Sequence, residues 1–397
     1  MEKLKRMGTL ALALVLAFST LSGCGGRPAG GSTSGPDGST SGSGDSSAAV
    51  AIDLAQITDP YLAVSGLAAD EVVITVGDVE VTAAEYLYWL NRIINSYLSQ
   101  YSDMASAPSW DTEIVSGFTI GQSLLNQASD MAVFHGMLRH LALAEGLSPD
   151  PSIASDTNEE YANLVIQANG DESQVVHTYW ANMLTLELLT KLYENNDLFE
   201  QLRELYYGEN SDSYPTDAEV NAYLDENGYF RVKHILLMTI DQATNQPLEE
   251  SVIAKKKATA DDLLAQLRAS EDPITLFDQL VNEYGEDGGM TVNADGYVFD
   301  NSDSLVGGFR EATLALSVGE ISDVVETAYG YHIMLRLPID PAGYRSDYAS
   351  QLLESRIDEE SERLGVVRTD AFDKLDVDSF WNNMQSLQAA VQAERAG

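Results

Sequence analysis

The chain is poor in cysteine and in positive charge. Its 397 residues include one cysteine, and 22 lysines and arginines stand against 62 aspartates and glutamates, which gives a formal net charge of -40. A single cysteine excludes an intramolecular disulfide and any site that needs several cysteine ligands for zinc or an iron–sulfur cluster. The shortage of basic residues argues against nucleic-acid binding, because phosphate binding needs a basic face. It also argues against electrostatic docking on anionic lipid.

Motifs for metal and nucleotide chemistry are missing as well. The sequence has no Walker loop, no Gly-x-Ser-x-Gly and no His-Glu-x-x-His. His135 and His140 are five positions apart, so on a helix they point about 140° apart and cannot share a metal. We therefore expect neither a metal nor a cofactor.

The N-terminus has the pattern of an export signal. Three basic residues precede a short apolar run from Leu10 to Phe18, and Leu-Ser-Gly-Cys follows at residues 21–24. The run is shorter than the ~20 residues that cross a bilayer, so it predicts a signal peptide over residues 1–23. Leu-Ser-Gly-Cys resembles the bacterial lipobox, which implies a lipid anchor on Cys24. An ordinary signal peptide followed by a chance cysteine is the alternative.

Composition divides the remaining chain into a tether and three folded parts. Residues 24–48 contain Cys24 and a run of mainly Gly, Ser and Thr, which predicts a flexible linker. Residues 49–210 read as mainly helical after a small hairpin around Gly77-Asp78. Helical segments are expected from Thr82 to Tyr97, from about Phe118 to Glu145, from about Asp156 to Asn169, and as one long helix from Glu172 to Tyr207.

Residues 211–340 have a different pattern. Two strands are expected, at Arg231–Met238 and Gly330–Leu337, and three helical stretches lie between them. Such an order predicts a compact α+β domain with a small mixed sheet. Residues 341–397 return to helix and are expected to pack on the N-terminal helical part. The fold class is therefore an α+β domain inserted between two mainly helical segments.

Two histidines and one long motif stand out in the middle domain. His234 lies on the first strand, in Lys-His-Ile-Leu, and residues 319–332 read Gly-Glu-Ile-Ser-x-Val-Val-x-Thr-x-x-Gly-Tyr-His. With this spacing the region from about Tyr229 to Leu337 resembles the parvulin family of peptidyl-prolyl isomerases, or rotamases. The layout of the whole chain is similar to PrsA-like secretion foldases and SurA-like periplasmic chaperones.

The resemblance implies roles for four polar residues. His234 and His332 match the paired histidines of the family, which lie on neighbouring strands under the active site. Asp287 matches the position that holds Cys or Asp beside the target bond. Thr327 matches the hydroxyl that bonds to the histidine pair. These four residues are the expected catalytic set.

The resemblance also implies a pocket for the proline ring. Phe309 matches its aromatic wall, Leu305 the methionine that often lines it, and Phe299 a further pocket aromatic. The chain departs from the family in several places. In one turn, the usual Gly-Gly-Asp-Leu-Gly-aromatic-Phe reads Asn-Ala-Asp-Gly-Tyr-Val-Phe from Asn293 to Phe299.

The chemistry of prolyl isomerisation fits such a site. Rotation about the X–Pro bond breaks amide resonance, with a barrier near ~20 kcal/mol, and needs neither a nucleophile nor a metal. An apolar pocket can hold the ring, and a fixed polar network can favour the twisted amide over the planar forms. Two histidines and a threonine hydroxyl form such a network only in defined tautomers.

We therefore predict a lipid-anchored, extracytoplasmic prolyl isomerase and foldase. Its partners would be unfolded or newly exported polypeptides with X–Pro bonds and, through Cys24, the cell membrane; no nucleic-acid partner is expected, and a homodimer is one option. One alternative is a parvulin-fold chaperone that holds clients with little or no catalysis. Another is a solute-binding lipoprotein, which needs two α/β lobes around a cleft.

The anchor can be tested directly. Cys24→Ser removes the acceptor thiol, so this variant should no longer take up a diacylglycerol label in cells, whereas the parent chain should. Uptake of label by the variant would rule out Cys24 as the acceptor. Two acyl chains on one lipid unit suffice for stable anchoring, where a single chain is marginal.

Overall fold

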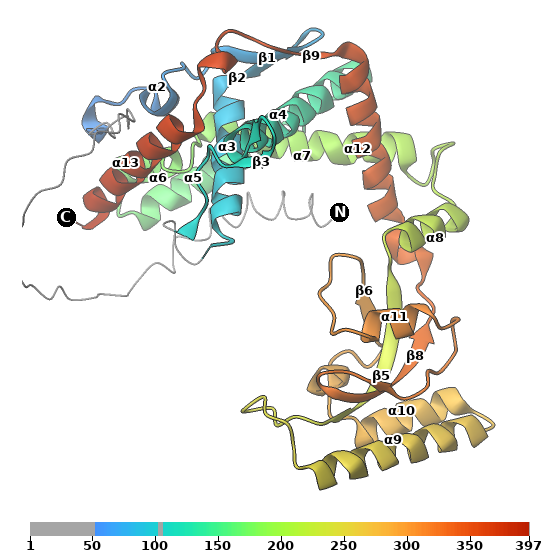
Figure 1. Cartoon of the computed structure of the whole chain (residues 1–397). Helices are drawn as coiled ribbons and strands as arrows, with labels where there is room; N and C mark the ends of the chain where they lie inside the picture. Colours follow the sequence, from blue (N-terminus) through green and yellow to red (C-terminus); the bar gives the residue numbers. More distant parts are fainter. Residues whose placement is uncertain (1–51, 102–105, 397) are drawn as a thin grey trace, which may run out of the picture. The chain divides into compact units, whose positions relative to one another are not determined.

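The computed structural model describes residues 52–101 and 106–396 (Figure 1). The predicted signal peptide, Cys24 and the whole predicted linker lie outside these residues. None of the described helices combines the length and apolar character needed to span a membrane. The chain separates into two compact units, one made of residues up to Ser213 together with those from Ser350 onward, and the other of Tyr214–Ala349.

The first unit is mainly helical and includes two small antiparallel sheets. Its helices are η2 (Leu54–Gln56), α2 (Pro60–Ser65), α3 (Ala83–Leu98), α4 (Ile120–Ala144), α5 (Ser152–Gln167), α6 (Glu172–Trp180), α7 (Leu186–Tyr207), η6 (Phe372–Lys374), α13 (Val377–Ala396) and the greater part of α12 (Arg345–Leu364). One sheet has the order β2-β1-β9, from β1 (Val72–Val76), β2 (Val79–Thr82) and β9 (Val366–Arg368). The other pairs β3 (Glu113–Val115) with β4 (Phe118–Thr119).

Local signals explain where two of the long helices begin. Thr82 and Glu85 form a reciprocal capping box at the start of α3, and Thr119 and Gln122 do the same for α4. Gly77 has φ +60° in the turn between β1 and β2, a conformation that favours glycine. The predicted hairpin around this glycine is therefore present.

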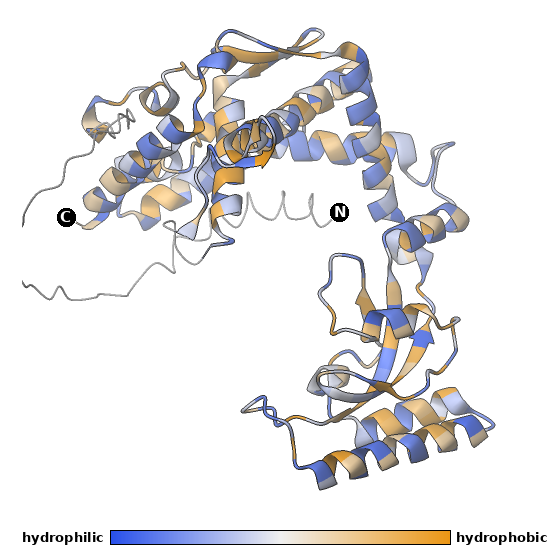
Figure 2. Cartoon of the chain, in the orientation of Figure 1, coloured by the Kyte–Doolittle hydropathy of each residue, from blue (hydrophilic) through white to orange (hydrophobic). Residues whose placement is uncertain are grey.

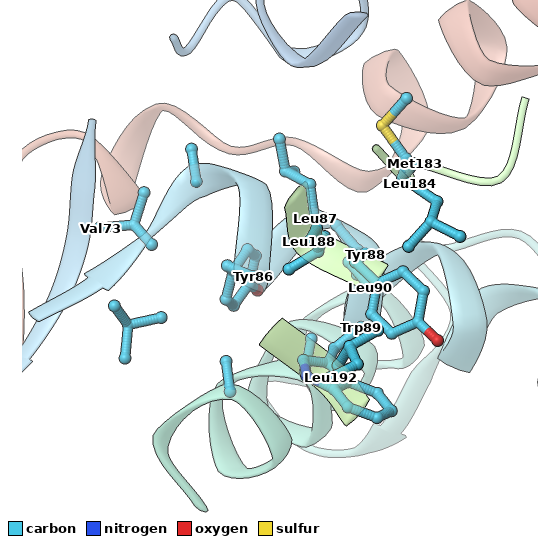
Figure 3. Packing of buried hydrophobic residues seen from close by; sticks show 14 of the residues in the cluster. Val73, Tyr86, Leu87, Tyr88, Trp89, Leu90, Met183, Leu184, Leu188 and Leu192 are labelled. Carbon is cyan, nitrogen blue, oxygen red and sulfur yellow. The ribbon is translucent and has the colours of Figure 1, made fainter. Parts of the chain in front are cut away.

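Both ends of the chain contribute to the core of this unit. Tyr86, Leu87 and Leu90 of α3 are fully buried in one cluster with residues of the C-terminal helices. Figure 3 shows part of this core, to which β1, α3 and the segment from Met183 to Leu192 contribute side chains. The buried residues that α12 and α13 add to this cluster are Leu353, Ile357, Val377, Phe380, Trp381, Met384, Leu387 and Val391.

The single long helix predicted over Glu172–Tyr207 is wrong. The chain forms α6 and α7, which are separated by a turn at residues 181–185. Met183 has φ +53°, outside the helical range, and its side chain is fully buried. Thr185 then accepts a hydrogen bond from the Leu188 amide and caps α7. Burial of an apolar side chain at the break thus overrides local helix propensity.

The second unit is built around a four-stranded antiparallel sheet of order β6-β5-β8-β7. The strands are β5 (Phe230–Met238), β6 (Tyr297–Phe299), β7 (Val325–Glu326) and β8 (Gly330–Leu337). The helices are α8 (Asp217–Glu226), α9 (Glu250–Ala269), α10 (Pro273–Tyr284), η4 (Gly288–Thr291), α11 (Phe309–Leu314) and η5 (Pro341–Tyr344). The predicted fold class, an α+β domain with a small sheet and surrounding helices between mainly helical segments, is confirmed. The predicted mixed strand directions are wrong, because every strand pair of this sheet is antiparallel.

The two central strands separate two apolar clusters. Ile235 and Leu237 of β5 are buried with residues of α9 and α10 on one face of the sheet. Phe230 and Val232 are buried with Phe309 of α11 in the other cluster. Successive residues of a strand point to opposite faces, so His234 lies on the face of Val232. Figure 2 shows apolar and polar residues mixed along α9 and α10.

The described residues do not form the two α/β lobes of a solute-binding protein. Among them, the other two sheets have three and two short strands and belong to a mainly helical unit. The solute-binding alternative is therefore wrong for the described part of the chain.

Burial predicts how much the C-terminal helix stabilises the first unit. Met384 on α13 is fully buried, so Met384→Ala should lower the free energy of unfolding by ~2–5 kcal/mol. Gln392→Ala changes an exposed position of the same helix and should cost less than about 0.5 kcal/mol.

Tryptophan fluorescence during urea unfolding measures this difference. All four tryptophans of the chain, at positions 89, 110, 180 and 381, belong to the first unit. The signal therefore follows that unit alone. Equal midpoints for the two variants would show that α13 adds little to the core.

Candidate active site

A cavity of about 370 Å³ opens on the α11 face of the sheet. Its walls come from β5, β6, β8, the turn before η4 and the segment that leads into α11. The lining residues are His234, Leu236, Met238, Asp287, Tyr297, Phe299, Ser304, Leu305, Val306, Phe309, Tyr329 and His332. The cavity is large enough for a small apolar ring and its flanking groups.

Strand register brings the two histidines together. In the antiparallel β5–β8 pair, His234 lies opposite Met334, and His332 lies opposite Leu236. Both histidines therefore project from the same face as diagonal neighbours. Their rings are stacked, with centroids 5.2 Å apart and planes 16° apart. Both are buried, with 6% of His234 and 2% of His332 exposed.

A continuous chain of polar contacts runs through the histidine pair. His234 Nδ1 lies 3.0 Å from His332 Nδ1, and His234 Nε2 lies 2.8 Å from Asp287 Oδ2. At the other end, Thr327 Oγ1 lies 2.9 Å from His332 Nε2. All four predicted polar residues thus belong to one hydrogen-bonded network.

Burial and hydrogen bonding set the charges of this network. Desolvation, followed by the nearby His234, lowers the pKa of His332 to about 3, so its ring is neutral at neutral pH. The hydrogen bond with His234 is the largest cause that holds the pKa of Asp287 below its usual range. Further bonds from Tyr297 and from the Gly289 amide act in the same direction. Asp287 is therefore an ionised carboxylate at neutral pH.

When each ring carries a single proton, each proton of the network has one place. An ionised Asp287 only accepts, so His234 carries its proton on Nε2 and has a free lone pair on Nδ1. His332 must then donate from Nδ1 to His234 and accept at Nε2 from the Thr327 hydroxyl. The amide of Tyr329 donates to Thr327 Oγ1 over 3.1 Å. For the threonine proton, His332 Nε2 at 2.9 Å is a nearer acceptor than the Gly330 carbonyl at 3.5 Å.

Aromatic side chains close the cavity around the histidines. The Phe309 ring meets His234 and His332 edge-on, with centroids 5.4 and 5.3 Å apart. Phe299 meets Phe309 edge-on at 6.3 Å. Leu305 is partly buried and packs against the same cluster. The predicted pocket residues therefore line one wall together, and Thr327 is the one predicted site residue that bonds to the network without lining the cavity.

The sequence did not point to several other lining residues. Leu236 and Met238 follow His234 at alternate positions of β5, so the strand period alone could have placed them on the same face. Tyr297 donates from its hydroxyl to Asp287 Oδ2 over 2.8 Å. No sequence signal marks that contact, because it joins η4 and β6 across a loop. Among the described residues, no group of three or more His, Cys, Asp or Glu side chains could hold a metal ion.

Comparison with known proteins places this site in a family context. Residues 221–335 match the family model for the PPIC-type PPIASE domain. The chain is 37% identical to the foldase protein PrsA of Geobacillus kaustophilus over 83 residues, which are 21% of this chain and 28% of that protein. The chain thus spans less than a third of this relative.

Two other matches extend over more of the chain. The foldase protein PrsA of Caldanaerobacter subterraneus is 24% identical over 286 residues, which are 72% of this chain and 78% of that protein. A crystal structure of the peptidylprolyl isomerase PrsA from Bacillus cereus is 17% identical, with a TM-score of 0.27, over 66% of this chain and 96% of that one. Sequence similarity to a PrsA foldase therefore extends beyond residues 221–335.

A double-mutant cycle tests whether the histidines act as one network. His332→Ala leaves His234 with an unpaired buried nitrogen, which should cost roughly 1–3 kcal/mol of stability. His234→Ala orphans His332 in the same way. The double variant should lose less than the sum of the two, because no orphaned partner remains.

Amide hydrogen exchange of β5 and β8 gives the free energy of opening for each variant. Additive losses would show instead that the two rings are independent core residues.

Proposed function

We propose that the chain is a prolyl cis–trans isomerase and foldase for exported proteins. The proposal is supported by the match of residues 221–335 to the PPIC-type, or parvulin-type, isomerase domain that the sequence predicted. The observation that carries the proposal is the Thr327–His332–His234–Asp287 network beneath an apolar cavity. Its clients are unfolded or newly exported polypeptides that contain X–Pro bonds.

The cavity supplies the binding part of the mechanism. Phe299, Leu305 and Phe309 offer an apolar surface for the proline ring, which carries no N–H that would need a partner. The site holds the proline ring still while the chain before it rotates, so the rotation takes place about the X–Pro bond. Binding energy on the ring then offsets part of the cost of the twisted amide.

Asp287 supplies the electrostatic part. A planar amide places partial negative charge on its carbonyl oxygen through resonance, and twisting reduces that charge. An ionised carboxylate next to the oxygen therefore destabilises the planar forms more than the twisted one. Because the charge is fixed before the substrate arrives, no reorganisation is needed during rotation. The histidine pair supports the carboxylate through the contact between His234 Nε2 and Asp287 Oδ2 and holds it in place.

The place of action follows from the N-terminal sequence. A signal peptide over residues 1–23 and a lipid on Cys24 would keep the isomerase at the outer face of the membrane as a lipoprotein. The mainly helical unit, at either end of the isomerase domain in sequence, then serves as a client-holding chaperone part. Association into a homodimer stays a prediction.

Turnover of an unphosphorylated Xaa-Pro peptide tests the activity. Asp287→Asn keeps the size of the side chain but removes the charge, so kcat/KM should fall by roughly 10–100-fold. Asp295→Asn is the matched control, because it removes an exposed carboxylate of the same domain outside the cavity; it should leave turnover unchanged.

Absence of turnover in the parent chain, together with protection of an unfolded client from aggregation, would contradict the catalytic proposal. That outcome would instead support the alternative of a chaperone that only holds clients.

A further inference from the structure

Tyr297 contacts the carboxylate on which the proposed mechanism depends. Its hydroxyl donates to Asp287 Oδ2, the same oxygen that lies 2.8 Å from His234 Nε2. The amide of Gly289 donates to the other oxygen, Oδ1, over 3.0 Å. Three donors thus hold one carboxylate, and each comes from a different stretch of chain.

Strand pairing places Tyr297 for this contact. Tyr297 is the first residue of β6 and lies opposite Val232, two residues before His234 on β5. Its ring meets His234 edge-on, with centroids 6.0 Å apart, and lines the cavity. The desolvation of the phenol, followed by the bond to Asp287, raises the pKa of Tyr297 to about 12, so it stays a proton donor at neutral pH.

The backbone near Asp287 leaves room for the hydroxyl. A Cβ on Gly289 would lie 2.0 Å from the Tyr297 oxygen, closer than two heavy atoms can approach. Gly289 is not among the glycines with positive φ. This position therefore needs glycine for space and not for its backbone conformation.

The turn before Phe299 differs from the parvulin motif at the position of this tyrosine. Where the parvulin motif usually has Gly-Gly-Asp-Leu-Gly-aromatic-Phe, the chain has Asn-Ala-Asp-Gly-Tyr-Val-Phe at residues 293–299. Tyr297 thus stands at a position where the motif has glycine. A glycine there has no side chain and could not reach the carboxylate.

We propose that Tyr297 is a positioning residue of the isomerase site, whose hydroxyl fixes the orientation of Asp287 and, through it, the tautomer of His234. The proposal rests on the proposed function for its effect on turnover. Without the hydroxyl, Asp287 keeps two donors and can rotate about its side-chain bonds. His234 then loses the fixed acceptor that holds its proton on Nε2, and the direction of every bond toward Thr327 becomes mixed.

The first test removes only the hydroxyl. Tyr297→Phe keeps the ring that lines the cavity, so KM for an unphosphorylated Xaa-Pro peptide should stay unchanged while kcat falls about tenfold. Removing a donor to the ionised form raises the pKa of Asp287, so the acid limb of the pH profile should move to higher pH. Tyr331→Phe is the control, because Tyr331 lies on the opposite face of the sheet, in the cluster of α9 and α10.

A second variant reaches the same contact from the other side. Gly289→Ala should displace the tyrosine hydroxyl and reproduce the loss in kcat. In the Tyr297→Phe background the hydroxyl is already gone, so Gly289→Ala should add little further loss. Losses that multiply independently would overturn the proposal.

Nuclear magnetic resonance separates this proposal from the proposed function. The full chain, labelled with ¹⁵N in its five histidines, should show one tautomer for His234 in the parent and a mixture in Tyr297→Phe. An unchanged tautomer together with an unchanged pH profile would overturn the role of Tyr297. A parent chain without turnover would overturn the isomerase function, and the histidine spectra would still decide whether Tyr297 fixes the network.

Discussion

The candidate site depends on the antiparallel register of β5 and β8, which sets Leu236 opposite His332. A shift of one residue in this pairing would turn His332 to the α9 and α10 side of the sheet. Burial holds the register in place, because in the observed pairing Ile333 and Leu335 face those helices and Met334 faces the opposite cluster. The packing that buries the core of the second unit therefore also fixes the geometry of its polar network. Asp287 and Thr327 need only short loops to reach a histidine pair that the sheet has already fixed.

The sequence predicts those parts of the fold whose signals are local. Capping residues mark the starts of α3 and α4, and apolar runs mark β5 and β8. The break between α6 and α7 escapes such reasoning, because Met183 leaves the helical conformation to bury its side chain in a core assembled from distant segments. The strand β9 escapes it too, since its three residues are exposed and show no alternation of burial.

The candidate site was predictable where a motif spans it. His332 and Thr327 belong to one uninterrupted run, and His234 is its expected partner, so their contact required no knowledge of the loops. To predict the contact between Tyr297 and Asp287, the path of the loops would have to be known. The tyrosine hydroxyl meets Asp287 only because β6 pairs with β5 and because Gly289 leaves space beside it. Side chains that meet through tertiary structure leave no periodic trace in the sequence.

The pairing of β1 with β9 has a consequence for the order in which the chain can fold. Thr369 donates a hydrogen bond to the carbonyl of Val72, and the two residues are 297 positions apart. A ribosome or translocase delivers the chain from its N-terminus, so β9 and α13 arrive last. Tyr214–Ala349 is continuous in sequence and can complete its sheet before that moment. The second unit can thus fold before the C-terminal segment of the first unit has been delivered.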